Sequence, residues 1–202
     1  MSGQLAVPQE VDLPAGLRPL SVRWHGRGGF GAKTAATLFA EMIIDAGGYG
    51  QAAPEFGPER RGAPVQAFTR IAPVPITLRG PIEEPDVLVV LDPRLLQTPT
   101  VTSGLRLNTW VLVNTSRPVS VPVVPAARII TLDASAIARQ TVGKDIPNIP
   151  MLAAVVALLD LVPRSWFLFW LRRRLGREFR GEIVDANLQA AEAAIAEVSR
   201  GR

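Results

Sequence analysis

The stretch His25-Gly26-Arg27-Gly28-Gly29-Phe30-Gly31-Ala32-Lys33-Thr34 joins a short apolar segment to an amphipathic one. Residues 20–24 predict a strand, and residues 32–46 repeat apolar side chains at the spacing of one helix face. Glycine lets a backbone turn tightly and approach a ligand closely, and the first N–H groups of a helix attract anions. The stretch therefore predicts a strand–loop–helix unit with a phosphate as its candidate ligand.

The glycine loop itself allows several interpretations. Gly26-x-Gly28-x-x-Gly31 fits the dinucleotide fingerprint, but the acid expected about 20 residues later is replaced by Gln51. The same letters nearly form a phosphate-binding P-loop, except that Lys33 is displaced by one position. The glycines can also serve only close packing of strand and helix. The candidate anion-binding residues are Gly26, Arg27, Gly28, Gly29, Gly31, Lys33 and Thr34.

A second unusual segment follows at residues 54–65, Pro-Glu-Phe-Gly-Pro-Glu-Arg-Arg-Gly-Ala-Pro-Val. Its acids and arginines can form a catalytic cluster or a docking surface, because guanidinium groups pair well with carboxylates and phosphates. The sequence offers no nucleophile–base pair, since it lacks cysteine and its single histidine lies elsewhere. We therefore favour an interface, formed by Glu55, Glu59, Arg60 and Arg61.

The rest of the chain predicts the fold class. Nearly all-apolar runs at 86–91, 110–113 and 128–132 are typical of strands buried on both faces, and each precedes a turn or helix start. Shorter strands are expected at 49–53 and 65–71. We expect an α/β, Rossmann-like, mostly parallel sheet flanked by helices, with C-terminal helices at 150–161, 165–175 and 182–198. Residues 1–17 are expected to be an N-terminal arm and residues 18–202 a single domain.

Four side-chain groups receive specific expectations. Asp92 is expected to cap a helix start, and Asn148 to cap the helix that begins at Pro150. His25 is expected to fill a turn and bond to backbone. The aromatic run 166–170, followed by three arginines, is expected in the core or at a subunit contact.

Composition excludes several function classes. The 202 residues hold no cysteine, which excludes disulfides and cysteine-ligated iron–sulfur clusters in this chain. With one histidine, a multi-histidine metal site is excluded as well. The net charge of +4 is scattered along the chain, so nucleic-acid binding is disfavoured. The apolar run 151–162 is too short for a membrane span, and no signal-peptide pattern begins the chain, so a cytoplasmic location is expected.

The two motifs together resemble a known family. The glycine loop, residues 54–65, Arg70-Ile71, Pro85-Asp86 and Leu91-Asp92 are similar to the gamma subunit of 2-oxoacid:ferredoxin oxidoreductases, which act on pyruvate, 2-ketoisovalerate and related acids. Asn148 with Met151-Leu152, and Asn187, extend the resemblance toward the C-terminus. It covers about residues 20–200, and the acid/arginine segment is its most specific part.

This resemblance implies a function in a complex. The complex oxidatively decarboxylates a 2-oxoacid to acyl-CoA and passes electrons to ferredoxin or another acceptor. Thiamine diphosphate, magnesium and iron–sulfur clusters are held by alpha, beta and delta-type subunits, and the gamma subunit covers the active site and guides coenzyme A. This chain alone is expected to hold no cofactor, to have no catalytic residues and to be inactive. Two alternatives stay open: a free-standing NAD(P)-binding oxidoreductase and a purely structural interaction subunit.

Overall fold

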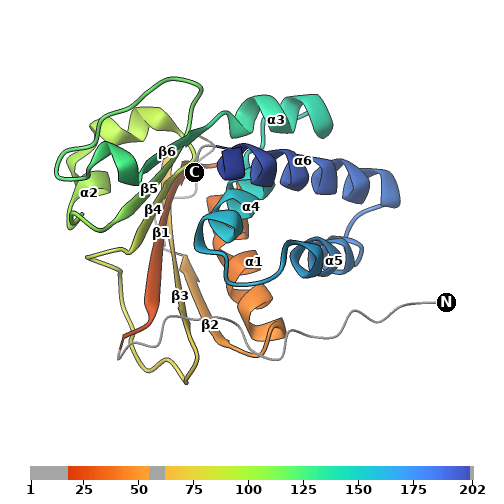
Figure 1. Cartoon of the computed structure of the whole chain (residues 1–202), viewed down its shortest axis with the longest axis horizontal. Coiled ribbons are helices and arrows are strands. Elements are labelled where there is room, and N and C mark those ends of the chain that lie inside the picture. Colours follow the sequence, from red (N-terminus) through yellow and green to blue (C-terminus); the bar gives the residue numbers. More distant parts are fainter. Residues whose placement is uncertain (1–17, 55–61, 201–202) are drawn as a thin grey trace.

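In the computed structural model, residues 18–54 and 62–200 are described, so the expected arm at 1–17 lies outside the described residues. The described residues form a six-stranded sheet with the strand order β2-β3-β1-β4-β5-β6 (Figure 1). Its strands are β1 (Leu20–Arg27), β2 (Tyr49–Pro54), β3 (Pro64–Ala72), β4 (Val87–Val90), β5 (Trp110–Asn114) and β6 (Ile129–Leu132).

The sheet is mixed. The neighbours β1, β4, β5 and β6 run parallel, as the fold class predicted from the sequence requires. By contrast, β3 runs antiparallel to both β1 and β2. Only residues 55–63 lie between β2 and β3, and a connection that short can join antiparallel strands, whereas parallel strands need a longer crossover. The α/β, Rossmann-like class is confirmed, with an antiparallel hairpin at one side of the sheet.

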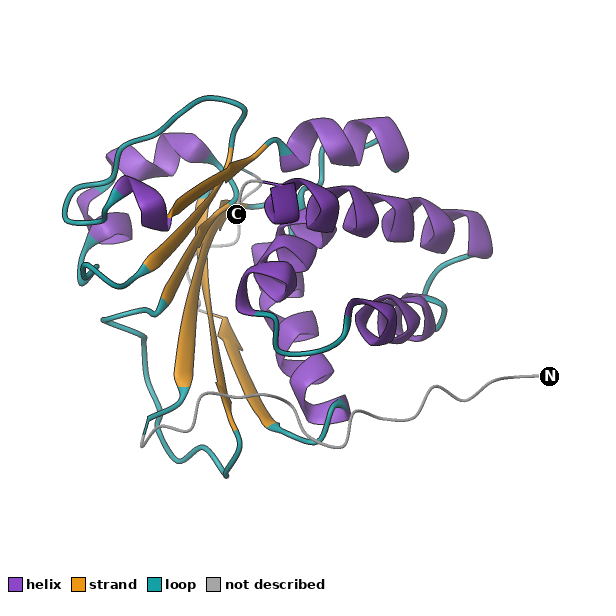
Figure 2. Ribbon diagram, in the orientation of Figure 1, coloured by secondary structure: helices purple, strands orange, loops and turns teal. Residues whose placement is uncertain are grey.

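Most helices cover one face of the sheet, while α2 lies on the other (Figure 1, Figure 2). Helix α1 lies against β2 and β3, α4 packs on α1 and α6, and α5 packs on α6. A 3-10 turn, η1 (Pro93–Gln97), follows β4, and another, η2 (Ala126–Arg128), precedes β6. The α-helices are α1 (Ala32–Asp45), α2 (Pro99–Thr102), α3 (Ala134–Thr141), α4 (Asn148–Leu159), α5 (Arg164–Leu175) and α6 (Gly181–Arg200).

Strand β4 shows how the sheet divides the core. Val87 and Val89 belong to the large apolar cluster beneath α1, α4, α5 and α6. Leu88 and Val90 belong to a smaller cluster on the opposite face, with residues of η1 and α2. Successive side chains of a strand point to opposite faces, so a strand buried between two layers must be apolar throughout. The sequence of β4 is a continuous apolar run because both faces of the strand are buried.

Two helix-start predictions have different outcomes. Asp92 does cap η1, accepting a hydrogen bond from the Arg94 backbone N–H at 3.1 Å. The prediction for Asn148 is wrong, because α4 already begins at Asn148 and Pro147 is its N-cap residue. The side-chain oxygen of Asn148 accepts from the backbone N–H of Ile149 at 2.8 Å. This leaves the Asn148 amide beside the loop that precedes α1.

The aromatic run of α5 belongs mainly to the core. Trp166, Phe167 and Trp170 are buried in the large cluster, and the Trp170 Nε1–H donates to the Asp45 carboxylate at 2.7 Å. Leu168 and Phe169 are half-buried, and Leu168 still packs against the cluster. The segment was expected either in the core or at a subunit contact, and its largest side chains lie in the core.

On the face of β1 that the helices α1, α4, α5 and α6 do not cover, a buried arginine hydrogen-bonds to the segments packed there. Arg23 is 3% exposed, and its guanidinium donates to the carbonyls of Ile82 and Glu83 at 3.3 and 3.1 Å. It also donates to the carbonyls of Val101 and Ser103 at 2.8 and 2.7 Å. One side chain thereby satisfies four backbone acceptors, two in the loop before β4 and two at the C-terminal end of α2, where the last carbonyls of a helix have no intrahelical donor.

Candidate functional site

The glycine loop lies at the carboxyl ends of the parallel strands β1 and β4, where successive strands begin to be added on the other side of the sheet. From β1 the chain passes through α1 to β2 and β3 on one side, whereas from β4 it proceeds to β5 and β6 on the other. In open α/β sheets, ligands bind in the crevice at such a switch point. The glycine loop and Asp92, which directly follow β1 and β4, meet at that crevice, because Leu91 N–H donates to the His25 carbonyl at 2.8 Å.

Two glycines of the fingerprint have a packing reason. A β-carbon on Gly26 would lie 3.1 Å from the β-carbon of Ala32, at the start of α1. Gly31 is the N-cap of α1, with φ 76°, and a β-carbon there would lie 2.7–2.9 Å from side-chain atoms of Asn148. The interpretation of the loop as close packing thus has direct support, independent of any ligand.

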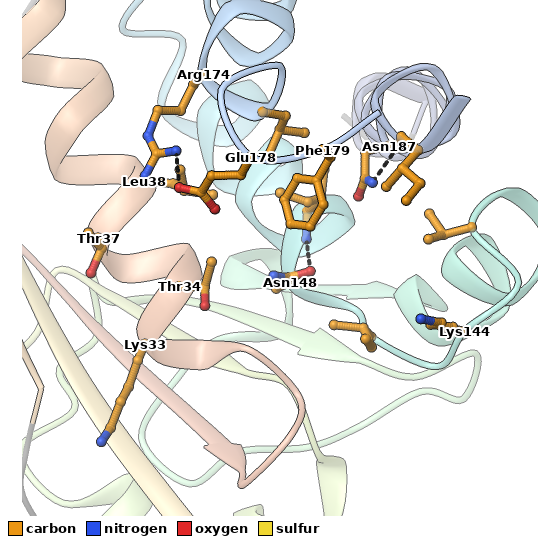
Figure 3. Close-up of a pocket in the computed structure, with 15 residues that line it drawn as sticks. Lys33, Thr34, Thr37, Leu38, Lys144, Asn148, Arg174, Glu178, Phe179 and Asn187 are labelled. Carbon is orange, nitrogen blue, oxygen red and sulfur yellow. Dashed lines mark hydrogen bonds and ion pairs between the residues drawn. The ribbon is translucent and has the colours of Figure 1, made fainter. Parts of the chain in front are cut away.

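The start of α1 is nevertheless suited to an anion. Gly31 makes no side-chain cap, and the first backbone N–H groups of a helix have no intrahelical acceptor. No acid lies in the first turn, which contains Lys33 and Thr34. Thr34 is exposed, and the half-buried Lys33 directs its side chain away from Thr34 and Asn148 (Figure 3). The candidate residues thus surround the helix start without all pointing at one place.

The structure joins the two sequence motifs through their backbones. Gly28 N–H donates to the Ala63 carbonyl at 2.9 Å, and Gly62 N–H donates back to the Gly28 carbonyl at 3.2 Å. The Arg27 guanidinium also donates to the Gly62 carbonyl at 3.0 Å. The acid/arginine segment therefore ends directly against the glycine loop. The expected interface residues Glu55, Glu59, Arg60 and Arg61 lie outside the described residues.

Arg27 is held by a buried carboxylate that the sequence reasoning assigned only to a helix cap. Asp92 is 2% exposed and accepts from Arg27 Nε at 2.5 Å and from Arg94 at 2.8 Å. Burial alone would raise the pKa of Asp92, but hydrogen bonds from Arg94 and Arg27 outweigh burial and place that pKa below its ordinary value. The signal was available: parallel neighbours end at one edge, so the end of β1 meets the residue that follows β4.

His25 differs from its expectation. It lies inside β1, not in a turn, and is 4% exposed. Its Nε2 atom has no hydrogen-bond partner among the described residues. Burial, with a smaller contribution from the charge of Arg23, lowers the pKa of His25 to about 3, so the imidazole is neutral at pH 7. A neutral, buried imidazole is poorly placed to exchange protons with a ligand at the surface.

A groove opens on the helix-covered side, next to the glycine loop. It has a volume of about 530 Å³ and lies between the first half of α1, the segment joining α3 to α4, and the segment joining α5 to α6 (Figure 3). Asn148 lines it and touches Gly31, so groove and glycine loop share one side chain. Its apolar residues are Leu38, Val142, Ile146, Ile149, Leu175, Phe179 and Ile183, and its polar ones include Lys33, Thr34, Thr37, Lys144, Arg174, Glu178 and Asn187.

Neither a three-ligand metal group nor a membrane-spanning helix occurs in the described part of the chain. Residues 18–54 and 62–200 contain no group of three histidine, cysteine or acidic side chains placed to hold a metal ion. Within the same ranges, no helix is long and apolar enough to cross a bilayer. Iron–sulfur ligation would require cysteines that the sequence lacks. The described residues therefore do not fit a metal centre or a cluster.

Comparison with known proteins gives consistent matches. Residues 21–197 match the family described as pyruvate ferredoxin/flavodoxin oxidoreductase. The chain is 39% identical over 189 residues to pyruvate synthase subunit PorC of Thermotoga maritima. That alignment covers 92% of this chain and 98% of that protein. It is 42% identical over 179 residues to the pyruvate/ketoisovalerate oxidoreductases common subunit gamma of Pyrococcus abyssi, covering 87% and 95%.

A solved structure agrees with these relatives. The crystal structure of pyruvate oxidoreductase subunit PORC from Thermotoga maritima superposes with a TM-score of 0.74 at 37% identity. The match covers 89% of this chain and 97% of that one. The likeness therefore extends over nearly the whole of both chains.

Proposed function

The chain belongs to the pyruvate ferredoxin/flavodoxin oxidoreductase family, and we propose that it is the gamma subunit of a thiamine-diphosphate-dependent 2-oxoacid oxidoreductase complex. In this proposal the complex converts a 2-oxoacid and coenzyme A to acyl-CoA and carbon dioxide. Two electrons leave to ferredoxin or another acceptor. Alpha, beta and delta-type partner subunits supply the thiamine diphosphate, magnesium and iron–sulfur clusters. This chain contributes no redox group, which is consistent with its lack of cysteine.

The chain's own contribution is to cover the active site and guide coenzyme A. The observation that carries this proposal is the joined pair of motifs at the switch point, where the glycine loop and the acid/arginine segment hydrogen-bond to each other. Phosphates of coenzyme A are anions of the kind that a helix start attracts. The α1 start, with Lys33 and Thr34 in its first turn, is the place proposed to receive one, with Arg27 beside it.

A free-standing NAD(P) enzyme is disfavoured by the sheet order. The ribose acid of a dinucleotide site comes from the strand that follows the first helix and pairs in parallel with the first strand. Here the neighbour of β1 on that side is the antiparallel β3, and β2, with Gln51, is one strand further away. The strand that carries the ribose acid in a dinucleotide site is therefore not next to β1 in this sheet.

A purely structural subunit remains the second candidate, because of the packing at Gly26 and Gly31. Both glycines are explained by contacts with Ala32 and Asn148 without any ligand. The two candidates differ in what a charge in the first turn of α1 does. If the turn receives a phosphate, removing that charge weakens coenzyme A binding; if the loop only packs, it does not.

The test is Lys33→Ala in the complete complex, purified with its partner subunits. We expect the coenzyme A concentration for half-maximal turnover to rise roughly ten- to a hundredfold, the loss of one charge-assisted contact of about 1.5–3 kcal/mol. Formation of the 2-oxoacid–thiamine adduct should stay unchanged, because that chemistry belongs to other subunits. Arg164→Ala, an exposed cation at the start of α5, is the matched control. An unchanged coenzyme A dependence would favour the structural subunit.

A further inference from the structure

The rim of the groove carries three large apolar side chains that face water. Ile146, Phe179 and Ile183 are 39%, 44% and 43% exposed, and they come from the α3–α4 connection, the α5–α6 connection and α6. The floor is different, since Ile149 and Leu175 are buried in the large core cluster. Exposed apolar side chains gathered around one depression are typical of a surface that another molecule covers.

Two cations at the margins of the groove, Arg174 and Lys144, differ in whether they form ion pairs with described residues. Arg174 is already paired, with the Glu41 carboxylate at 2.7 Å and with Glu178 at 2.6 Å. Lys144 is exposed at the margin next to Ile146 and makes no ion pair with any residue of the described ranges. One margin of the groove therefore combines apolar side chains with a positive charge that no acid of the described part of the chain pairs, and a carboxylate on the occupant would complement it.

We infer that this groove seats a segment of a partner subunit that bears apolar side chains and a carboxylate to pair with Lys144. The inference rests on the proposed function, because it takes the chain to be a subunit of a complex. A second copy of this chain is a poorer fit, since each copy carries a net charge of +4. A protein segment can cover the exposed apolar rim and the buried floor together.

The location agrees with the rest of the site. Asn148 lines the groove and also contacts Gly31, so a segment seated there would lie beside the start of α1. The partner would then complete the surroundings of the glycine loop from the helix-covered side. Phe179 and Lys144 stand at separate points of the rim (Figure 3), which allows the apolar and the charged contact to be tested independently.

The experiment is co-purification and titration of the complex with Phe179→Asp and Lys144→Glu variants. We expect Phe179→Asp to weaken association with the partner subunits by at least about tenfold, because it replaces a large apolar contact of the rim with a charge that the partner would have to desolvate. Lys144→Glu should weaken it about three- to tenfold and Lys144→Arg should restore it, because the charge is what the partner reads. Leu107→Asp, 70% exposed and distant from the groove, is the control expected to assemble normally.

Each outcome is decisive. Normal assembly of both groove variants overturns the inference and leaves the proposed function intact. A wild-type chain that fails to associate with oxidoreductase subunits overturns both. Self-association of the isolated chain that Phe179→Asp abolishes, with partner binding unaffected, assigns the groove to a second copy and overturns the inference. Circular dichroism establishes that each variant is folded, and Lys144→Glu decides the question if Phe179→Asp is not.

Discussion

The sheet face beneath α1, α4, α5 and α6 buries an almost continuous apolar layer, whereas the opposite face of β1 and β3 buries Arg23, His25 and Arg70. The difference follows from what covers each face. Helices satisfy their own backbone groups and need only apolar surface below them. The loop before β4 and the C-terminal end of the four-residue helix α2 leave carbonyls without partners, and the arginines donate to those of residues 80–83, 101 and 103. A polar core layer here replaces the hydrogen bonds that a helix would bring.

The largest test of this contrast removes a side chain from the helix-covered face. Phe167→Ala deletes a fully buried ring, and we expect the free energy of unfolding to fall by about 3–5 kcal/mol. Phe179→Ala, on the groove rim, is the same substitution at an exposed site and should cost less than about 0.5 kcal/mol. Urea unfolding measures both, and equal effects would contradict the division between core and rim.

The polar face is tested by Arg23→Met, which keeps the length of the side chain but removes its donors. Four carbonyls lose their partner in a buried site, so we expect a loss of about 1.5–3 kcal/mol in the free energy of unfolding. Arg164→Met at an exposed position is the control. If Arg23→Met unfolded at the same urea concentration as wild type, the guanidinium would be dispensable and the comparison of the faces would fail.

The single histidine makes the polar face sensitive to pH. The pKa of His25 is about 3 in the folded chain and about 6.5 when unfolded, so the unfolded state binds the extra proton between these values. Stability should therefore fall as pH falls, by up to about 1.4 kcal/mol per unit, or about 1.6 kcal/mol from pH 6.5 to 5. Urea unfolding across this range measures the slope, and His25→Gln should flatten it. An unchanged slope in that variant would show that other groups cause it.

The smallest effect is expected at Asp92, where the network reaches the surface. Asp92→Asn should cost about 1 kcal/mol in the free energy of unfolding, because asparagine keeps only one of the two acceptor oxygens and removes the negative charge that pairs with Arg27 and Arg94. The folded pKa of Asp92 is depressed, so its contribution is present above pH 4 and disappears as pH falls through the folded pKa. Thermal unfolding at pH 7 and at low pH measures this difference. Asp145→Asn, in an exposed pair with Arg139, is the control.

Periodicity predicted much of this fold from the sequence alone. The helix α1 was found from apolar side chains at a period of 3.6, and the strand β4 from a continuous apolar run, because both patterns report burial directly. The antiparallel placement of β3 was not found, since strand direction depends on which neighbours pair, and both β2 and β3 look alike as short strands. The buried Arg23 was also missed, because an arginine within a strand gives no sign of the carbonyls that will surround it.

The candidate site was predicted in part. Sequence reasoning singled out the glycine loop and the acid/arginine segment, and the structure brings their backbones together at Gly28 and Ala63. It did not foresee that Asp92 would hold Arg27, or that Asn148 would rest on Gly31. Both contacts join residues more than 60 positions apart, and only the pairing of whole elements brings them within reach. Binding of an anion by Lys33 stays a prediction.

The contact between Gly31 and Asn148 limits how these two positions can change during evolution. A side chain at position 31 collides with asparagine at 148, whereas a smaller residue at 148 is compatible with glycine at 31. Substitutions at the two sites must therefore occur in one order, with position 148 changing first. Even then the backbone at 31, with φ 76°, admits few residues other than asparagine and aspartate. A lineage that keeps Asn148 thus loses the option of replacing the last glycine of the loop.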